Sequence, residues 1–248
     1  MPVRPPRSGC FHRVYLLVAF TLMTIPISLT AQQTDVARYD VFTGFSFFET
    51  PHLNLAEHGF HTQVGLNLKP WLSTGFDYSV VNGHDSLTPN LLTTSLQQEL
   101  GGELELLIAA GIIPPTYKLS VPVDAFTQTF ALGPQLAYRH YKSATFFIRP
   151  SIGAVRQTAT PRPADPIAAA IVQQLVPSGH KTDWQGFYGV GGGFAVNTTR
   201  YLDWRVQTDF VYWHLYDDLL KDGAWTMRFS VGPTFHFGRN IVNPAKRP

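Results

Sequence analysis

Residues 225–237 alternate between apolar and polar side chains almost without interruption, and this pattern constrains the fold more than any other feature of the chain. Successive side chains of a β-strand point to opposite faces, so a period of two predicts a strand with two unlike faces. One face carries Trp225, Met227, Phe229, Val231, Phe235 and Phe237, and the other carries Thr226, Arg228, Ser230, Gly232, Thr234 and His236. Similar segments occur at 39–48, 60–69, 72–81, 126–141, 145–155, 186–197 and 202–213. Eight such strands with aromatic-rich apolar faces predict an all-β, antiparallel barrel that faces lipid.

The predicted connections between these strands alternate in length. Those after the second, fourth and sixth strands are short, at 70–71, 142–144 and 198–201. Those after the first, third, fifth and seventh strands are longer, and the longest are 82–125 and 156–185. Short turns on one side and long loops on the other are typical of barrels in the Gram-negative outer membrane. An even number of strands then predicts that both termini lie in the periplasm with the short turns.

The two longest loops contain helical patterns. Residues 94–110 place one apolar stripe at helical spacing, and Gly111 and Pro114 end it. In the second loop Asp165 is a predicted N-cap, Pro166 takes the first helical position, and Pro177 ends the helix. We expect two short amphipathic helices that cover the extracellular mouth and pack on each other or on the rim. The stripes comprise Leu96, Leu100, Leu104, Leu107 and Ile108 in the first helix, and Ile167, Ile171 and Leu175 in the second.

The first 31 residues have the features of a secretory signal peptide. Arginines precede an apolar run from Tyr15 to Leu29, and Ala31 is a plausible cleavage site. A membrane anchor is the alternative, but the run is shorter than the roughly 20 residues that a spanning helix needs. Cys10 leaves with the signal, so the mature chain has no disulfide, thiol nucleophile or cysteine-type zinc site. The predicted plan is a signal peptide (1–31), a short lead (32–38), a barrel (39–237) and a periplasmic tail (238–248).

The end of the last strand carries a more specific pattern. Ser230, Gly232, Phe235 and Phe237 resemble the C-terminal signal that the barrel-assembly machinery reads on outer-membrane proteins, although here the chain continues to Pro248. The whole plan resembles the small eight-stranded transmembrane barrels of the OmpA and OmpX type. This resemblance implies that the partners are outer-membrane lipids and lipopolysaccharide, the assembly machinery and periplasmic chaperones. No peptidoglycan-binding domain follows the last strand, so that function is not expected.

Seven charged residues fall on the predicted inward faces. They are Asp77, Arg139, Arg149, Asp203, Arg205, Asp209 and Arg228. An eight-stranded barrel is just wide enough for side chains to fill, and buried charges must be paired. We therefore expect an interior network of salt bridges, with a narrow ion path as the alternative. The inward glycines Gly189, Gly191 and Gly193 are predicted to leave room for Arg149 and Arg205.

Aromatic residues at the strand ends predict two belts at the membrane surfaces. The periplasmic belt comprises Tyr39, Trp71, Tyr138, Trp204, Phe235 and Phe237, and the outer belt comprises Phe47, Phe60, Tyr78, Tyr188, Tyr212 and Trp225. A soluble periplasmic ligand-binding barrel is the alternative, and it would instead point its aromatic residues inward and its charges outward.

The sequence offers little sign of chemistry. The net charge of +2 gives no indication of nucleic-acid binding, and the nine histidines are too scattered to indicate a metal site. An outer-membrane enzyme that modifies lipid A is an alternative, with His58, the run His84-Asp85-Ser86, and His214 as candidates. No nucleophile elbow, zinc-protease helix or phosphate loop is present. We expect a non-enzymatic barrel without cofactor or open pore, whose role is structural in the envelope or lies in surface interaction with an extracellular ligand.

Overall fold

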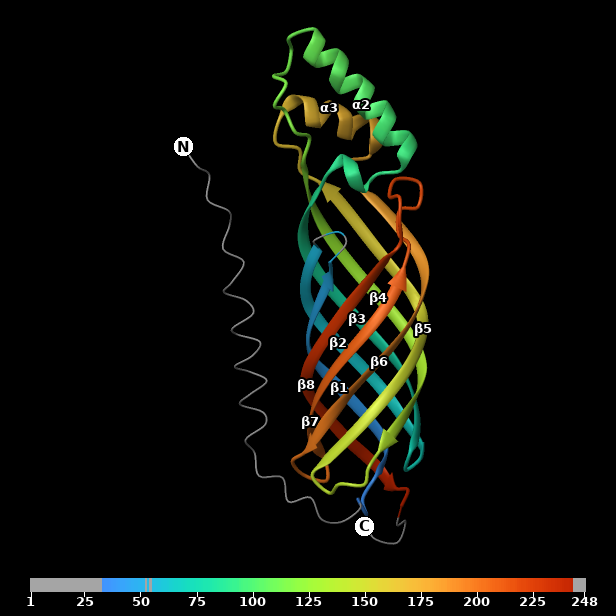
Figure 1. Cartoon of the computed structure of the whole chain (residues 1–248). Helices are drawn as coiled ribbons and strands as arrows, with labels where there is room; N and C mark the ends of the chain where they lie inside the picture. Colours follow the sequence, from blue (N-terminus) through green and yellow to red (C-terminus); the bar gives the residue numbers. More distant parts are fainter. Residues whose placement is uncertain (1–32, 52, 54, 243–248) are drawn as a thin grey trace.

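The computed structural model describes residues 33–51, 53 and 55–242, so the predicted signal peptide and most of the predicted tail lie outside the described residues. In this part of the chain eight strands pair antiparallel with their neighbours in sequence, and β1 also pairs with β8, which closes a barrel (Figure 1). The predicted eight-stranded, up-and-down antiparallel barrel is confirmed. The strands are β1 (Ala37–Thr50), β2 (Leu55–Lys69), β3 (Leu72–Leu87), β4 (Val121–Tyr138), β5 (Ala144–Pro161), β6 (Lys181–Asn197), β7 (Leu202–Trp213) and β8 (Ala224–Asn240).

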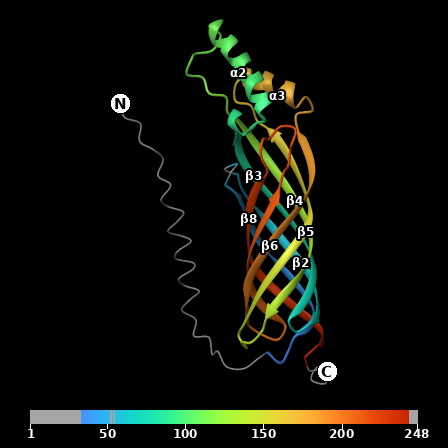
Figure 2. The ribbon, with the colours of Figure 1, turned by 45° about the vertical axis from the view of Figure 1, so that its right-hand side comes forward.

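The two ends of the barrel differ. Both ends of the described chain lie at one of them, the terminus end, whereas two helices cover the other, the cap end (Figures 1 and 2). The connections at the terminus end are 70–71, 139–143 and 198–201, and those at the cap end are 51–54, 88–120, 162–180 and 214–223. The predicted alternation of short and long connections therefore holds for six of the seven connections, but the prediction of a longer first loop is wrong because it has only four residues.

Most strands are longer than the alternation of the sequence indicates. The pattern ends β3 at residue 81 and begins β4 at residue 126, whereas the strands reach Leu87 and Val121. β4 and β5 each have 18 residues, more than the roughly 9–11 that cross a membrane. The additional residues lie at the cap end, where outward positions such as Asn82 and Thr158 are polar. The alternation of apolar and polar residues ends there, so the sequence pattern does not predict this part of the strand. The pairing with the neighbouring strand nevertheless continues.

The helices form a cap with its own small core. α2 (Thr94–Ala109) and α3 (Pro166–Leu175) lie next to each other above the cap end, as predicted (Figure 1). Leu100 of α2 packs with Ala168 and Ile171 of α3, and the cluster also contains Leu92, Leu119 and Val121. Asp165 caps α3 by accepting hydrogen bonds from the backbone amides of Ile167 and Ala168. No helix within the described residues combines the length and the apolar character needed to cross a membrane.

The β7–β8 connection (214–223) folds into the cap-end mouth of the barrel. Leu215, Tyr216 and Leu220 pack on Phe48 and Trp213, which point inward from the strands. The Tyr216 hydroxyl donates to the carbonyl of Gln157 (2.9 Å), and its backbone amide donates to Asp183 (2.6 Å). The Leu92–Leu220 bridge joins this connection to the β3–β4 loop below the cap. The upper lumen therefore holds an apolar plug, and the sequence pattern does not assign its loop residues Leu215, Tyr216 and Leu220 to the interior.

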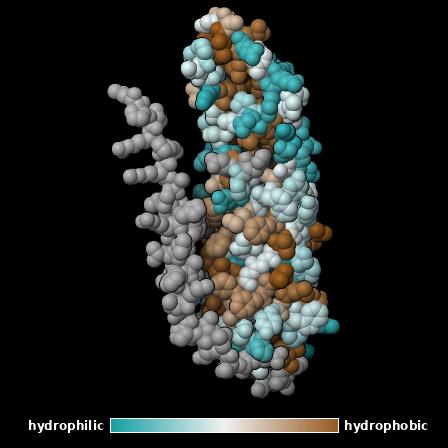
Figure 3. Space-filling model, in the orientation of Figure 1, coloured by the Kyte–Doolittle hydropathy of each residue, from teal (hydrophilic) through white to brown (hydrophobic). Residues whose placement is uncertain are grey.

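The outside of the barrel carries the predicted aromatic residues. Hydrophobic side chains gather over the middle and lower barrel, whereas hydrophilic ones are more frequent toward the cap end (Figure 3). Tyr39 stacks on Phe237 near the terminus end, and Tyr188, Tyr212 and Trp225 form a cluster further up. Phe42 and Phe48, which interrupt the alternation of the first strand, are buried inside the barrel. The barrel thus has an apolar, aromatic outer surface and a mostly polar lumen below the plug.

Candidate functional site

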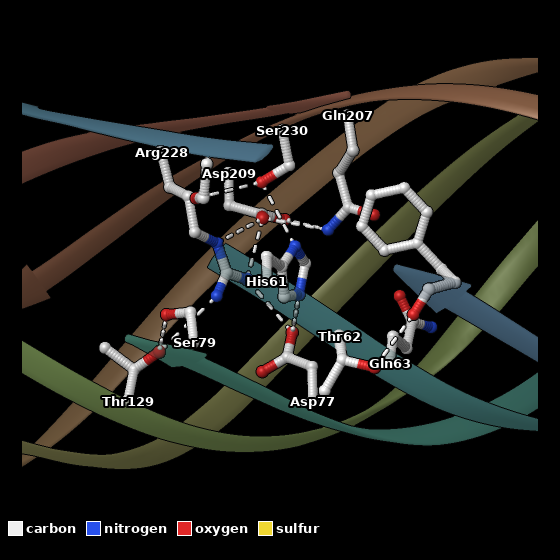
Figure 4. A network of polar contacts seen from close by, with 12 residues as sticks. His61, Thr62, Gln63, Asp77, Ser79, Thr129, Gln207, Asp209, Arg228 and Ser230 are labelled. Atoms are coloured by element: carbon white, nitrogen blue, oxygen red, sulfur yellow. Dashed lines mark hydrogen bonds and ion pairs between the residues drawn. The ribbon is translucent and has the colours of Figure 1, made fainter. Parts of the chain in front are cut away.

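The centre of the lumen is occupied by an ion cluster around Asp77. Its carboxylate lies 2.6 Å from Arg149. It also lies 3.0 Å from Arg228, which contacts Asp209 at 2.7 Å (Figure 4). All four side chains are at most 3% exposed. They come from β3, β5, β7 and β8, so the cluster joins strands from different parts of the barrel wall. The structure thus brings together four of the seven charges on which the predicted network depends.

Neutral polar side chains complete the cluster. The Gln63 side-chain oxygen accepts from Arg149 (3.1 Å) and from Arg205 (3.2 Å), while Gln207 donates to both carboxylate oxygens of Asp209. These hydrogen bonds satisfy groups that the ion pairs leave open. A search for opposite charges alone misses the glutamines, although their inward positions follow from the strand alternation.

His61 is the most notable residue that the search for charged partners misses. It is fully buried between Ser230, whose hydroxyl lies 3.0 Å from Nδ1, and Asp77, whose carboxylate lies 3.4 Å from Nε2 (Figure 4). A serine, a histidine and an aspartate in contact are the groups of a hydrolytic triad. However, none of the three residues has any surface exposed to solvent, and the carboxylate of Asp77 is also held by Arg149 and Arg228. In this structure the three side chains are part of the interior packing.

The other three predicted network residues lie toward the terminus end and form different contacts. Arg205 stands between the rings of Phe42 and Phe147, at 5.7 Å and 4.7 Å from their centroids, and makes no salt bridge among the described residues. Asp203 pairs with His236 (2.8 Å). Arg139 follows the end of β4, because that strand stops at Tyr138 and not at residue 141. Among the described residues the predicted network of salt bridges therefore does not include Arg205 or Arg139, whose contacts are with aromatic rings and neutral oxygens.

The inward glycines of β6 leave room for groups of β7, which the prediction did not include. Gly191 also lies directly opposite Arg149 in the pairing of β5 with β6, and the predicted space for Arg149 and Arg205 stays a prediction. A side chain at Gly191 would collide with the carboxylate of Asp209, and one at Gly189 would meet Val211 and the backbone of β7. Because Gly191 has no side chain, β7 can lie close to β6 at this point. Asp209 can therefore reach Arg228.

Two of the histidines considered for catalysis, His84 and His214, have other contacts. Alternation along β3 places His84 and Ser86 on the outer face, whereas Asp85 faces inward, so the run cannot act as a unit. His84 instead contacts Asp124 (2.6 Å), which also binds Arg162 at the exposed rim. His214 lies near a backbone carbonyl only, and within the described residues no group of three potential ligands could hold a metal ion.

The residues of the assembly signal all lie on β8. Ser230 and Gly232 face inward, whereas Phe235 and Phe237 point outward. Gly232 lies so close to the backbone of Thr43 on β1 that a side chain there would collide with it. It therefore allows close contact between the first and last strands. Recognition by the assembly machinery stays a prediction.

Comparison with known proteins gives matches in structure only. No protein family matches the sequence, and none of the curated proteins matches it. Similar solved structures include Neisserial surface protein A (TM-score 0.48, 7% identity, covering 80% of this chain and 96% of that one). OprG from Pseudomonas aeruginosa (0.46, 7%, 84% and 100%) and Ail of Yersinia pestis in complex with the heparin analogue sucrose octasulfate (0.42, 11%, 80% and 96%) are also similar. These values are too low to support any argument about function, so the fold assignment rests on the strand pairing described above.

Proposed function

We propose that the protein is an integral outer-membrane barrel without enzymatic activity or an open pore, whose helical cap forms a surface for contact with molecules outside the cell. Insertion into lipid is supported by the outward apolar and aromatic side chains, among them Phe76, Ile148 and Trp204, each more than 40% exposed. If the cap contacts molecules outside the cell, the terminus end lies on the opposite side of the membrane, in the periplasm.

A closed lumen is supported by two successive barriers. The apolar plug fills the upper lumen, and the Asp77 cluster with its glutamines fills the middle. Purified protein in planar lipid bilayers should therefore give no steady conductance under an applied voltage. Regular conductance steps that disappear on boiling would contradict the proposal.

The main support for a surface role is the ordered packing of the cap. Two helices share a buried core and are joined to the rim by the Leu92–Leu220 bridge, so the cap is an ordered unit and not a pair of loose loops. Leu106 and Ile112 are nevertheless 72% and 64% exposed. Exposed large apolar side chains on an ordered surface often mark contacts with other molecules.

A two-part experiment tests this proposal. Outer-membrane fractions are first compared boiled and unboiled by gel electrophoresis, and a shift in mobility identifies a folded membrane barrel. A deletion strain is then complemented with the native protein, with a variant in which a Gly-Ser linker replaces residues 94–109, and with the double variant L106S/I112S. A surface role predicts that all three proteins fold, whereas only the native protein restores adhesion or ligand binding by whole cells.

A purely structural role in envelope integrity is the second candidate, supported by the density of buried polar contacts between strands. It predicts that the variant with the linker restores resistance to detergent as fully as the native protein. Full restoration of every measured phenotype by this variant would overturn the surface role.

A further inference from the structure

A cavity formed by the described residues lies at the terminus end, in the mouth of the barrel. Its volume is about 410 Å³, within the range of about 300–1,000 Å³ that is typical of small-molecule sites. One wall is the lead into β1 (residues 33–37), and the others are the β4–β5 and β6–β7 turns with the ends of β2 and β8. We refer to this cavity as the vestibule.

Positive side chains dominate the vestibule. Arg139, Lys142, Arg200 and His236 line it, with Asp35 as its one carboxylate. Arg139, Lys142 and Arg200 take part in no salt bridge among the described residues, whereas His236 contacts Asp203. A concave site with an excess of positive charge concentrates anions.

The vestibule is held in shape by hydrogen bonds across the mouth. The Gln33 side chain donates to the carbonyl of Tyr141 (3.0 Å) and to the hydroxyl of Thr145 (2.8 Å). On the opposite side the Asn240 side chain donates to the carbonyl of Thr34 (3.0 Å). The lead is thus fixed to both β5 and β8, which gives the cavity a preformed wall.

Arg139 has a particular position in this frame. Its Nε donates to the carbonyl of Pro70 (2.9 Å), while the two Nη atoms lie at longer distances from Gln33 (3.4 Å) and Asn67 (3.3 Å). All three acceptors are neutral oxygens. The guanidinium is therefore oriented by its Nε, and its outer edge can form stronger, charge-assisted hydrogen bonds with an oxyanion.

The vestibule ends inside the barrel and does not continue as a channel. Deeper in the lumen, Asp40 accepts from Asn67 (3.1 Å), and Arg205 is stacked between Phe42 and Phe147. An anion that enters from the terminus end meets these packed side chains. This favours binding over passage.

We propose that the vestibule binds a small anion with two or more carboxylate or phosphate groups. Several separated cations around one cavity match a ligand with several negative groups better than a monovalent ion. The site faces the periplasm in the orientation proposed above, but binding itself does not depend on the surface role of the cap.

The test is isothermal titration of the full folded protein, in a neutral detergent at constant ionic strength, with pyrophosphate and separately with citrate. We expect a Kd below about 1 mM for at least one of them. R139Q should weaken binding by about tenfold or more. R200Q, which removes an exposed cation that lies over the Tyr201 ring, should weaken it less and should leave folding unaffected. R156Q is the matched control, because Arg156 faces outward toward the cap end beside Trp184.

Binding of pyrophosphate alone identifies phosphate as the preferred group, binding of citrate alone identifies carboxylate, and either result supports the proposal. Absence of heat from both anions would overturn it. So would equal weakening by R156Q and R200Q, because binding would then reflect the total charge and not the vestibule.

Discussion

Asp77 is the carboxylate whose removal should destabilise the barrel most. It contacts both Arg149 and Arg228 at no exposure to solvent, and Arg228 keeps a second carboxylate in Asp209. Arg149 has no other carboxylate partner among the described residues, so the substitution D77N leaves one buried cation without a counter-charge. Asparagine preserves the shape of the side chain, so the change creates no cavity. Removal of one partner from a buried ion pair costs about 3–5 kcal/mol, and we expect D77N to lower the free energy of unfolding by that amount.

The assay is reversible unfolding by urea of the protein folded into lipid vesicles, followed by tryptophan fluorescence. The matched control is D124N. Asp124 also contacts two basic groups, Arg162 and His84, but it does so at the exposed rim. Water screens that pair, so the control should unfold like the native protein. The double variant D77N/R149Q removes the stranded cation and should recover part of the loss. Equal midpoints for D77N and D124N would refute the argument that burial gives the cluster its energy.

Three further outcomes follow from the interior and the cap. G191A should push Asp209 away from its arginine and lower stability by about 1–3 kcal/mol, whereas G186A on the same strand meets only the backbone oxygen of Gly153 at an ordinary contact distance of 3.9 Å and should be neutral in the same unfolding assay. Arg205→Ala should lower the temperature at which the folded band disappears from gels, because it removes ring contacts and a hydrogen bond; an unchanged temperature would exclude such a role. The backbone amide of Ala168 holds the pKa of Asp165 below its ordinary value of 3.8. This cap therefore stabilises α3 above pH 3.8, and hydrogen exchange of α3 should accelerate as the pH falls through the lower pKa of the folded state, while D165N should show no such dependence.

The sequence predicts the parts of this molecule in which two unlike environments alternate along the chain. β7 has the predicted bounds because an apolar outer face alternates with inward polar residues over most of its length. β3 to β6 extend beyond the pattern at the cap end, where outward positions such as Asn82 and Thr158 are polar, so the outer face lacks the apolar residues on which the pattern depends. The α3 helix is predicted from the local chemistry of Asp165 and Pro166, and α2 from its leucine stripe, so neither depends on knowing the rest of the fold.

The candidate site is less predictable for a physical reason. Alternation tells which residues face inward, but their partners depend on the height of each residue in the tilted barrel. Arg149 meets Asp77 across the lumen, whereas Arg205 meets only rings and an amide. The sequence does not predict the plug for two reasons. Phe48 is apolar at an inward position where the alternation expects a polar residue, and Tyr216 belongs to a loop. The vestibule depends on a lead segment without any secondary-structure pattern.

Because β1 pairs with β8, every strand of the closed barrel has two neighbours and none is an edge strand. The amide of Val36 donates to the side chain of Asn240 (3.2 Å), and the amide of Ile241 donates to the carbonyl of Val36 (2.9 Å), so the two ends of the barrel chain are direct neighbours. A short linker could therefore join them, and the chain could be opened at the 139–143 turn without changing any strand neighbour. The barrel is in this sense a ring of hairpins.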